Sequence, residues 1–462
     1  MKIAIGYPPL ESPKGTPLLS QNRQFQWFSN KLTAYAIYPV VMASAATLLK
    51  EKGYDVVWLD GVAEKWTQEQ FLEKLKKEKP DLIVFEIKTP VIKKYWQLIN
   101  QLKKLQTPGF KPQTVLLGDH VTALPQESME NSKVDFILTG GDYDFALLNL
   151  VDYLTKGAKL SPGVWYRASS IKNTGHFQLN HQLDKLPLID RDLTRWQLYS
   201  RKNSNFYRAP GAYTMFGRDC WWGRCTFCSW TTLFPGKNFR SCSVEKALDE
   251  VGHLIEKYQV REIMDDSGTF PVGNWLREFC QGMIKRGYNK KIRFNCNMRF
   301  NAGLDEKDYQ LMGKAGFRFI LYGLESANQK TLDRINKNSR VEMIEPVLTW
   351  AVKAGLMPHI TVMVGYPWEE KEDVQKTLNL ARELFKKGLV FTMQATVVIP
   401  YPGTPLFSQC QKNHWLKTED WDRYDMREPI MKTKLKDEEL MACARSLYAS
   451  FASPQFIWRT LS

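Results

Sequence analysis

Cysteine is absent from the first 219 residues of this 462-residue chain, although eight cysteines follow. A disulfide framework would spread its cysteines through a small secreted domain. Here three cysteines fall within nine residues, and the others are scattered at Cys242, Cys280, Cys296, Cys410 and Cys443. The clustering favours a metal site over disulfides. We expect the scattered five to be small buried hydrophobic side chains.

Long apolar runs are also missing. The longest nearly apolar segment, residues 38–49, has 12 residues and is too short to span a bilayer. Pro8 and Pro9 stop the apolar run at the N-terminus, where a signal peptide would need a continuous apolar core. We therefore expect a cytoplasmic protein.

Low-complexity stretches and internal repeats are absent as well, and the length suits two or three domains. The net charge of +15 is of the kind that attracts nucleic acid, anionic lipid or a phosphorylated substrate. Lysine and arginine nevertheless occur only in short groups such as residues 74–79. We interpret these groups as solvated helix faces and expect no specific nucleic-acid partner.

The first 160 residues alternate between strand and helix patterns. Strands are predicted at residues 3–6, 55–59, 81–87, 114–117 and 135–138, and helices at 35–50, 71–79, 91–105 and 144–154. Five strands alternating with helices predict an α/β domain, residues 1–160, with an open, Rossmann-like parallel sheet covered on both faces. Ligands of such sheets bind beyond the carboxyl ends of the strands.

Small and polar residues stand at those predicted carboxyl ends and allow close approach to a large ligand. They include Pro8, Pro9, Thr89, Gly118, His120, Gly140 and Gly141.

A connector, residues 161–205, leads to a second strand–helix rhythm in residues 206–408. Strands are predicted at 213–216, 262–264, 293–298, 319–323, 359–364 and 391–399. Six β/α units predict a partial or full TIM-type parallel barrel, whose catalytic groups gather at the carboxyl ends of the strands. Residues 409–462 form a predicted helical extension that caps the barrel. Its apolar tail, residues 456–458, suggests a peripheral membrane contact as an alternative.

The three clustered cysteines, Cys220, Cys225 and Cys228, follow the first barrel strand and so belong to the predicted catalytic mouth. Structural zinc normally has four protein ligands, and Cys242 and His253 are the nearest further candidates in sequence. A [4Fe–4S] cluster held by three thiolates keeps one iron open, as a catalytic metal requires. The iron–sulfur interpretation is favoured, with zinc as the alternative.

This segment resembles the signature of the radical S-adenosylmethionine (SAM) superfamily. Phe227 between the last two cysteines matches the family's aromatic residue, which contacts adenine. The spacing is Cys-x4-Cys-x2-Cys, one residue longer in the first interval than the usual family spacing. The resemblance implies that the open iron chelates SAM, which is reductively cleaved to a 5′-deoxyadenosyl radical. At later strand ends it implies SAM contacts from Asp266, Ser267, Arg299, Glu325, Ser326 and Gly365.

The N-terminal domain before such a barrel resembles the cobalamin-binding class of this superfamily, with similarity to its hopanoid-linked and anaerobic chlorophyll-ring cyclase branches. The resemblance implies cobalamin over the strand ends, at Pro8, Pro9, Thr89, Gly118 to His120, Gly140 and Gly141. The family's Asp-x-His-x-x-Gly cobalt-ligand motif is missing. We interpret His120 as a loop histidine bonded to backbone, and expect cobalamin without a histidine ligand. A degenerate sheet without cofactor is the alternative.

The resemblance implies an enzyme that methylates an unactivated carbon with a [4Fe–4S] cluster, SAM and cobalamin. The alternatives are radical C–C bond formation, cyclisation or rearrangement, and a non-catalytic cluster or cobalamin sensor. Expected partners are a small-molecule or lipid-like substrate and an electron donor such as flavodoxin or ferredoxin. Four aromatic residues are candidate walls for a bulky apolar substrate: Trp221, Trp222, Trp230 and Tyr322.

Overall fold

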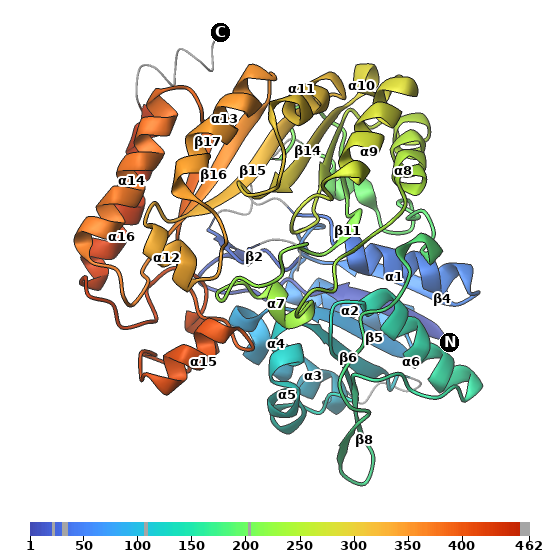
Figure 1. Ribbon diagram of the computed structural model, residues 1–462. Coiled ribbons are helices and arrows are strands. Elements are labelled where there is room, and N and C mark those ends of the chain that lie inside the picture. The colour runs from blue at the N-terminus through green and yellow to red at the C-terminus, as the bar shows by residue number, and fades with distance from the viewer. Residues whose placement is uncertain (21–23, 30–35, 106–109, 202–204, 453–462) are drawn as a thin grey trace.

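The computed structural model describes residues 1–20, 24–29, 36–105, 110–201 and 205–452. The apolar tail at residues 456–458 and the predicted start of the first helix at residue 35 lie outside the described residues. Two parallel sheets organise the chain, and Figure 1 shows the N-terminal sheet, blue to teal, below the yellow and orange strands of the second sheet.

The N-terminal sheet has the strand order β4-β1-β5-β6-β7, all parallel. Its strands are β1 Lys2–Tyr7, β4 Asp55–Asp60, β5 Leu82–Ile87, β6 Gln113–Gly118 and β7 Phe136–Leu138. All five strands were predicted from short apolar runs, and β5 and β7 are buried along their whole length. The strand order reverses between β1 and β5, which is where ligands of open parallel sheets bind.

Helices cover both faces of this sheet: α1 Val40–Glu51, α2 Gln68–Glu78, α3 Ile92–Lys104, α4 Asp119–Ala123, α5 Pro125–Asn131 and α6 Tyr143–Lys156. Helices α1 and α6 pack against each other. Right-handed crossovers in this strand order place α2 and α3 on the opposite face. Two antiparallel strands, β8 Val164–Arg167 and β9 Ile171–Asn173, extend the sheet at β7. They fall in the predicted connector and were not predicted.

The second sheet has the order β10-β13-β14-β15-β16-β17 and is parallel throughout. Its strands are β10 Gly211–Thr214, β13 Glu262–Asp265, β14 Arg293–Met298, β15 Phe317–Glu325, β16 Met357–Val364 and β17 Thr392–Val397. All six correspond to predicted strands. In the described part of the chain β10 and β17 are edge strands, so the barrel is a partial one.

The barrel helices follow from amphipathic runs in the sequence. They are α8 Val244–Glu256, α9 Asn274–Lys285, α10 Tyr288–Lys291, α11 Glu306–Lys314, α12 Gln329–Arg334, α13 Ile344–Lys353 and α14 Lys371–Lys386. Ser243 caps the start of α8, where its hydroxyl accepts a hydrogen bond from the Lys246 amide at 3.3 Å.

The C-terminal extension covers more than the barrel. Helix α16, Asp437–Ser446, packs on β17 and α14, as expected for a cap. The short helix η5, Trp421–Arg423, instead lies against α3 of the N-terminal domain. Lys93 forms an ion pair with Asp420 at 2.5 Å, and the Trp421 indole donates to Glu127 at 2.9 Å. The extension therefore also fastens the two domains together.

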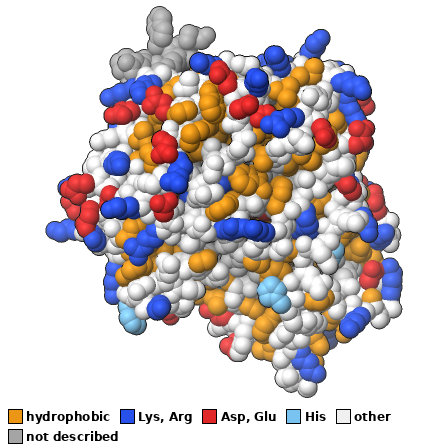
Figure 2. All heavy atoms as spheres, in the orientation of Figure 1, with side chains coloured by type: hydrophobic (Ala, Val, Ile, Leu, Met, Phe, Trp, Pro, Cys, Tyr) orange, Lys and Arg blue, Asp and Glu red, His pale blue; other side chains and the backbone are white. Residues whose placement is uncertain are grey.

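None of the described helices combines the length and the apolar character that crossing a membrane requires. On the face drawn in Figure 2, basic and acidic side chains are interspersed rather than gathered into one basic patch.

Candidate functional site

The cysteine loop is closed at its base by a short antiparallel ribbon. Strand β11, Gly217–Arg218, pairs with β12, Arg240–Ser241, so residues 219–239 leave the barrel and return to the same place. The loop includes the helical turn α7, Trp230–Leu233, which contacts α4 of the N-terminal domain. The loop that carries the cysteines therefore lies between the two domains (Figure 1).

Cations and hydrogen-bond donors surround the three thiols. The Arg299 guanidinium lies 3.6 Å from the Cys225 sulfur, and Thr269 donates to the Cys220 sulfur at 2.8 Å. Burial raises the pKa of Cys225, while the positive charges of Lys337 and Arg299 oppose that rise. Burial and the neighbouring thiols Cys225 and Cys220 raise the pKa of Cys228. Two buried cations beside three sulfurs suit an anionic cluster.

Contacts with the barrel hold the loop on both sides of Cys225. The Trp222 indole donates to the Asn336 carbonyl at 2.7 Å, and the Thr226 amide donates to the Ile335 carbonyl at 2.9 Å. Gly223 has φ +58°, and a Cβ atom there would lie 2.7 Å from the Gly236 carbonyl oxygen. The additional residue is thus accommodated by a glycine turn against the return segment of the loop.

The number of thiols in the loop bears on which metal it could hold. Structural zinc normally has four protein ligands, whereas this loop offers three cysteines. Among the described residues, no three His, Cys, Asp or Glu side chains form a group already placed to hold a metal ion. The ligand count therefore favours a cluster with one open iron over structural zinc.

A central cavity of about 220 Å³ lies where the cysteine loop faces the N-terminal sheet. Its barrel wall includes Phe227, Cys228, Ser229, Trp230, Glu325, Thr361, Met363 and Ile399. Its other wall is formed by residues that follow β5 and β6, namely Lys88, Thr89, Pro90 and Asp119. The carboxyl ends of both sheets thus open into one cavity, which is where both folds bind ligands.

Two of the predicted SAM contacts line this cavity, Phe227 and Glu325. Glu325 follows a register shift between β15 and β16 and has φ +62°. Its carboxylate forms a buried ion pair with Lys337 at 2.6 Å. Arg299 lies at the cysteine loop, where it stacks on Trp221 and Trp222 at 5.4 and 5.1 Å. Arg299 is therefore placed to hold the loop.

The other residues predicted to contact SAM are engaged within the protein. Ser326 is fully buried and donates to Glu369 at 2.9 Å, and burial raises the pKa of Glu369 to about 7. The Ser267 hydroxyl accepts from the Gly217 amide at 2.8 Å and so supports the base of the cysteine loop.

Asp266 is buried behind that base, and its amide donates to the Thr214 carbonyl at 2.8 Å. Gly365 has φ +98° and leaves room for Leu440 of α16.

Some of the predicted cobalamin residues line a cavity, and others contact other parts of the protein. Thr89 lines the central cavity, and Pro9 lines a separate edge cavity of about 340 Å³ beyond β1 and β4. Pro8 is buried. Gly118 has φ +131°, and a side chain there would collide with the Ile87 carbonyl of the adjacent strand. That glycine is explained by strand packing.

His120 is fully buried and both of its ring nitrogens have protein partners. Nε2 lies 3.0 Å from a Glu127 oxygen, and Nδ1 lies 3.3 Å from the Thr89 hydroxyl. Trp96 and Trp421 pack on the ring with centroids at 6.3 and 5.2 Å. The sequence predicted backbone partners for His120, whereas its partners in the structure are side chains. The histidine has a structural role in this arrangement.

Gly140 and Gly141 also face protein atoms. A Cβ atom on Gly140 would collide with Phe177, and one on Gly141 would collide with Phe234 of the cysteine loop. The absence of a side chain at these glycines is thus explained by packing, on the connector at Gly140 and on the cysteine loop at Gly141, and their contact with cobalamin stays a prediction.

The aromatic candidates for a substrate wall are placed differently from the prediction. Trp230 lines the central cavity, whereas Trp221 and Trp222 stack on Arg299. Tyr322 is fully buried and donates to the Tyr309 hydroxyl at 3.0 Å.

Sequence reasoning missed a second cavity inside the barrel, the lumen cavity, of about 500 Å³. It shares Gln24, Phe25, Thr396 and Met426 with the central cavity. Its strand wall includes His359, Thr392 and Gln394. Alternation along β16 and β17 was the available signal, because residues two apart point to the same side of a strand.

Comparison with known families gives the class of each domain. Residues 214–381 match the model of the radical SAM superfamily, and residues 33–148 match the model of the B12-binding domain. The chain thus carries a radical SAM domain and a B12-binding domain.

Relatives over most of the chain include an uncharacterised methyltransferase of Pyrococcus horikoshii, 27% identical over 419 residues, with 89% of this chain and 87% of that protein covered. The anaerobic magnesium-protoporphyrin IX monomethyl ester cyclase of Rubrivivax gelatinosus is 27% identical over 426 residues, with 89% and 73% covered.

Two solved structures share the fold. The cobalamin-dependent SAM radical enzyme OxsB superposes with a TM-score of 0.72 at 15% identity, over 96% of this chain and 66% of that one. The radical SAM methyltransferase TsrM from Kitasatospora setae gives 0.70 at 13% identity, over 98% and 89%.

Proposed function

We propose that this chain is an enzyme that uses a [4Fe–4S] cluster, SAM and cobalamin to methylate an unactivated carbon. The observation that carries the proposal is the central cavity, whose walls come from the cysteine loop and from the carboxyl edge of the B12-binding sheet. The names of the relatives, a methyltransferase and a cobalamin-dependent radical enzyme, support the same reaction class.

Cys220, Cys225 and Cys228 are the proposed cluster ligands. A bound cluster would supply one electron to the sulfonium of SAM, which cleaves it to methionine and a 5′-deoxyadenosyl radical. Arg299 and Lys337 stabilise the negative charge of the site. Phe227 and Glu325 line the space next to the loop and are the proposed SAM contacts.

The opposite wall is the proposed place of cobalamin, which would carry the methyl group. Thr89 and Asp119 offer oxygen atoms there, and Lys88 offers a buried cation. Both ring nitrogens of the nearest strand-end histidine, His120, are occupied by protein partners, which supports binding without a histidine ligand. Trp230 and Met363 contribute apolar walls that exclude water from a radical site.

The lumen cavity indicates a substrate with hydrogen-bonding groups. His359, Thr392 and Gln394 line it, and Lys14 and Asp425 of its wall form an ion pair at 2.6 Å. This lining favours a polar small molecule as the substrate over the bulky apolar one that the sequence suggested. A one-electron donor such as flavodoxin or ferredoxin and a cytoplasmic location complete the proposal.

The test is anaerobic reconstitution of the full chain with iron and sulfide, followed by addition of cobalamin, SAM and dithionite. Methylation predicts both 5′-deoxyadenosine and S-adenosylhomocysteine, because one SAM is cleaved to the radical and another gives up its methyl group. Cys225→Ala is the matched negative control. The absence of 5′-deoxyadenosine from the wild-type protein would contradict the proposal and favour a non-catalytic sensor.

A cyclase or C–C bond-forming enzyme is the second candidate, favoured by the similarity to the Rubrivivax gelatinosus cyclase. It predicts 5′-deoxyadenosine without S-adenosylhomocysteine in the same assay.

A further inference from the structure

Two arginines face each other across the ribbon that closes the cysteine loop. Arg218 of β11 is the register partner of Arg240 of β12. Like charges directly opposite each other on adjacent strands destabilise the pairing. The Arg218 side chain is only 3% exposed and that of Arg240 is 18% exposed. The ribbon therefore needs nearby negative charge to stay closed.

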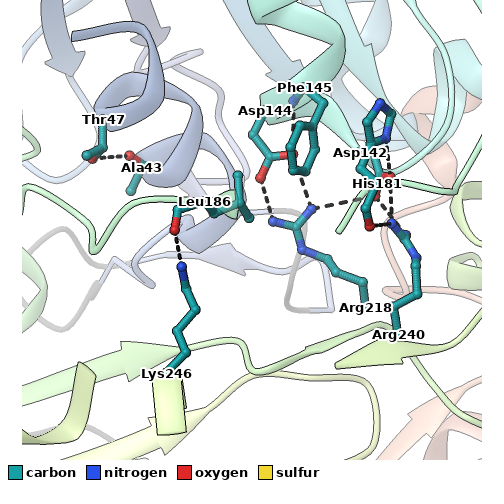
Figure 3. A network of polar contacts seen from close by, with 10 residues as sticks. All are labelled: Ala43, Thr47, Asp142, Asp144, Phe145, His181, Leu186, Arg218, Arg240 and Lys246. Atoms are coloured by element: carbon teal, nitrogen blue, oxygen red, sulfur yellow. Dashed lines mark hydrogen bonds and ion pairs between the residues drawn. The ribbon is translucent and has the colours of Figure 1, made fainter. Parts of the chain in front are cut away.

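That charge comes from the other domain, at the start of α6. Arg218 Nη2 lies 2.6 Å from Asp144 Oδ2, and the Asp144 side chain is fully buried. Arg240 binds Asp142 through two bonds, from Nη1 to Oδ2 and from Nη2 to Oδ1, each 2.8 Å long. Figure 3 shows both arginines reaching from the ribbon to these two carboxylates.

His181 of the connector completes the arrangement. Its Nδ1 lies 2.8 Å from Asp142 Oδ2, and its ring stacks on Phe145 at 4.3 Å (Figure 3). Arg240 also donates to the His181 carbonyl at 3.0 Å. Asp142 thus receives charged or polar donors from the barrel ribbon and from the connector together.

A second observation places the loop at this same point. Gly141, next to Asp142, packs so closely on Phe234 of the cysteine loop that a side chain at residue 141 would collide with its ring. Packing and ion pairs therefore join the same short segment, residues 141–144, to the base and the far arm of one loop.

We propose that Asp142 and Asp144 are positioning residues that fix the iron–sulfur loop relative to the B12-binding sheet. They neutralise the opposed arginines only when the loop and the sheet edge are docked. The two cofactor sites are thereby held at one separation. The link between this docking and the two cofactors rests on the proposed function. The docking itself can be measured without any reaction.

The test is hydrogen–deuterium exchange with mass spectrometry on the anaerobically reconstituted full chain. Arg240→Gln removes the charge at a partly exposed position, and Arg240→Lys keeps it. Asp152→Asn is the matched control, since Asp152 lies on the same helix α6 but its partners, exposed Lys156 and Tyr54, both belong to the N-terminal domain and not to the loop.

We expect Arg240→Gln to speed exchange in residues 219–239 about tenfold, the equivalent of one charged hydrogen bond. Arg240→Lys keeps the charge but not the paired hydrogen bonds and should restore part of the protection, whereas Asp152→Asn should leave the loop unchanged. Should Arg240→Gln not fold, Asp142→Asn is measured by the same criteria.

Unchanged exchange in the loop would overturn the proposal, as would an equal rise over the whole barrel, which is the sign of general destabilisation. If the proposed function is wrong but the docking is right, no 5′-deoxyadenosine forms in the assay, while the exchange rates still change as expected.

Discussion

The two edges that meet at the central cavity occupy equivalent places, each at the carboxyl ends of a parallel sheet, yet they use their polar residues differently. On the barrel edge, the cysteine loop extends into the space between the domains, and Cys228 with its neighbours Phe227 and Ser229 lines the cavity. On the N-terminal edge, His120 and Asp142 are already bonded to protein groups.

A strand-end position therefore makes a residue available for a ligand but does not determine whether it binds one. Spacing predicts the cysteines as cluster ligands, because three thiols in one loop have few structural partners. A single histidine or glycine has many possible structural partners, and here His120, Gly140 and Gly141 contact other parts of the protein. In the proposed function, the N-terminal edge would bind cobalamin through its shape and through residues such as Thr89, which lines the cavity.

The largest effect is expected on the barrel edge. Cys225→Ala and Cys228→Ala should each lose nearly all bound iron and lower 5′-deoxyadenosine formation by more than about 100-fold, since removal of a catalytic group costs this much or more. Iron and sulfide analysis after anaerobic reconstitution measures the bound cluster. Chromatography of the assay mixture measures the 5′-deoxyadenosine formed.

Cys280→Ala is the matched control for these variants, because Cys280 is fully buried in α9 away from the loop. It should keep its iron. Retained iron together with retained SAM cleavage in both loop variants would contradict the assignment of the cluster.

A second prediction concerns stability at the docking point. Burial opposes ionisation of Asp142, but hydrogen bonds from His181 and Arg240 and the charge of Arg218 outweigh it and lower the pKa of Asp142 to about 2. Its stabilisation is present above the unfolded-state pKa of about 3.9 and is lost only as the pH falls toward 2. Asp142→Asn should therefore cost about 2–4 kcal/mol.

Thermal melts between about pH 5 and pH 8 measure this cost. The decrease in Tm caused by Asp142→Asn should be the same at both ends of that range. A decrease that vanishes toward pH 5 would show that the carboxylate titrates there and is not ion-paired as described.

For Asp60, at the carboxyl end of β4, we expect the opposite effect of ionisation on stability. Burial raises its pKa to about 6, although hydrogen bonds from Tyr199 and from the Ala63 amide oppose the rise. A raised carboxyl pKa means that the folded protein holds the proton more tightly, so the ionised form costs stability above about pH 6 and the cost fades as the pH falls.

Asp60→Asn should thus stabilise the protein by about 1–2 kcal/mol near pH 8 and by much less near pH 5. The same series of melts tests it, with Asp142→Asn as the variant of opposite sign. A destabilisation that is equal at both pH values would mean that the carboxylate is favourable as an ion.

The smallest effect is expected at His120. Since both ring nitrogens contact protein groups and tryptophan rings enclose the imidazole, His120→Gln should leave cobalamin retention within about twofold of wild type. The visible spectrum of the bound cobalamin should also stay the same. A spectral shift with loss of cobalamin would identify His120 as a ligand after all.

Much of the fold was predictable because the strands of the N-terminal sheet are short apolar runs and the strands of the second sheet alternate with amphipathic helical segments. The hairpin β8–β9 was not, since both strands are short and half-exposed and therefore lack that signal. The cysteine spacing likewise predicted the loop and its place at the mouth of the barrel.

Individual contacts were less predictable. The register shift between Gly323 and Glu325 changes the alternation at the end of β15, so Glu325 lines the cavity and Ser326 turns to Glu369. Asp144 and Arg218 acquire their roles from each other's domain, and no local pattern links residues 74 positions apart. Such pairings are properties of the docked domains.

The central cavity is proposed to hold both cofactors at once, and one measurement tests this most directly. Electron paramagnetic resonance of the full chain, loaded with cobalamin and reduced so that the cluster and cob(II)alamin are both paramagnetic, measures their magnetic interaction. Two cofactors in one cavity should give spectra broadened or split by dipolar coupling between the two centres. A spectrum that is the simple sum of an isolated cluster and an isolated cob(II)alamin would contradict it.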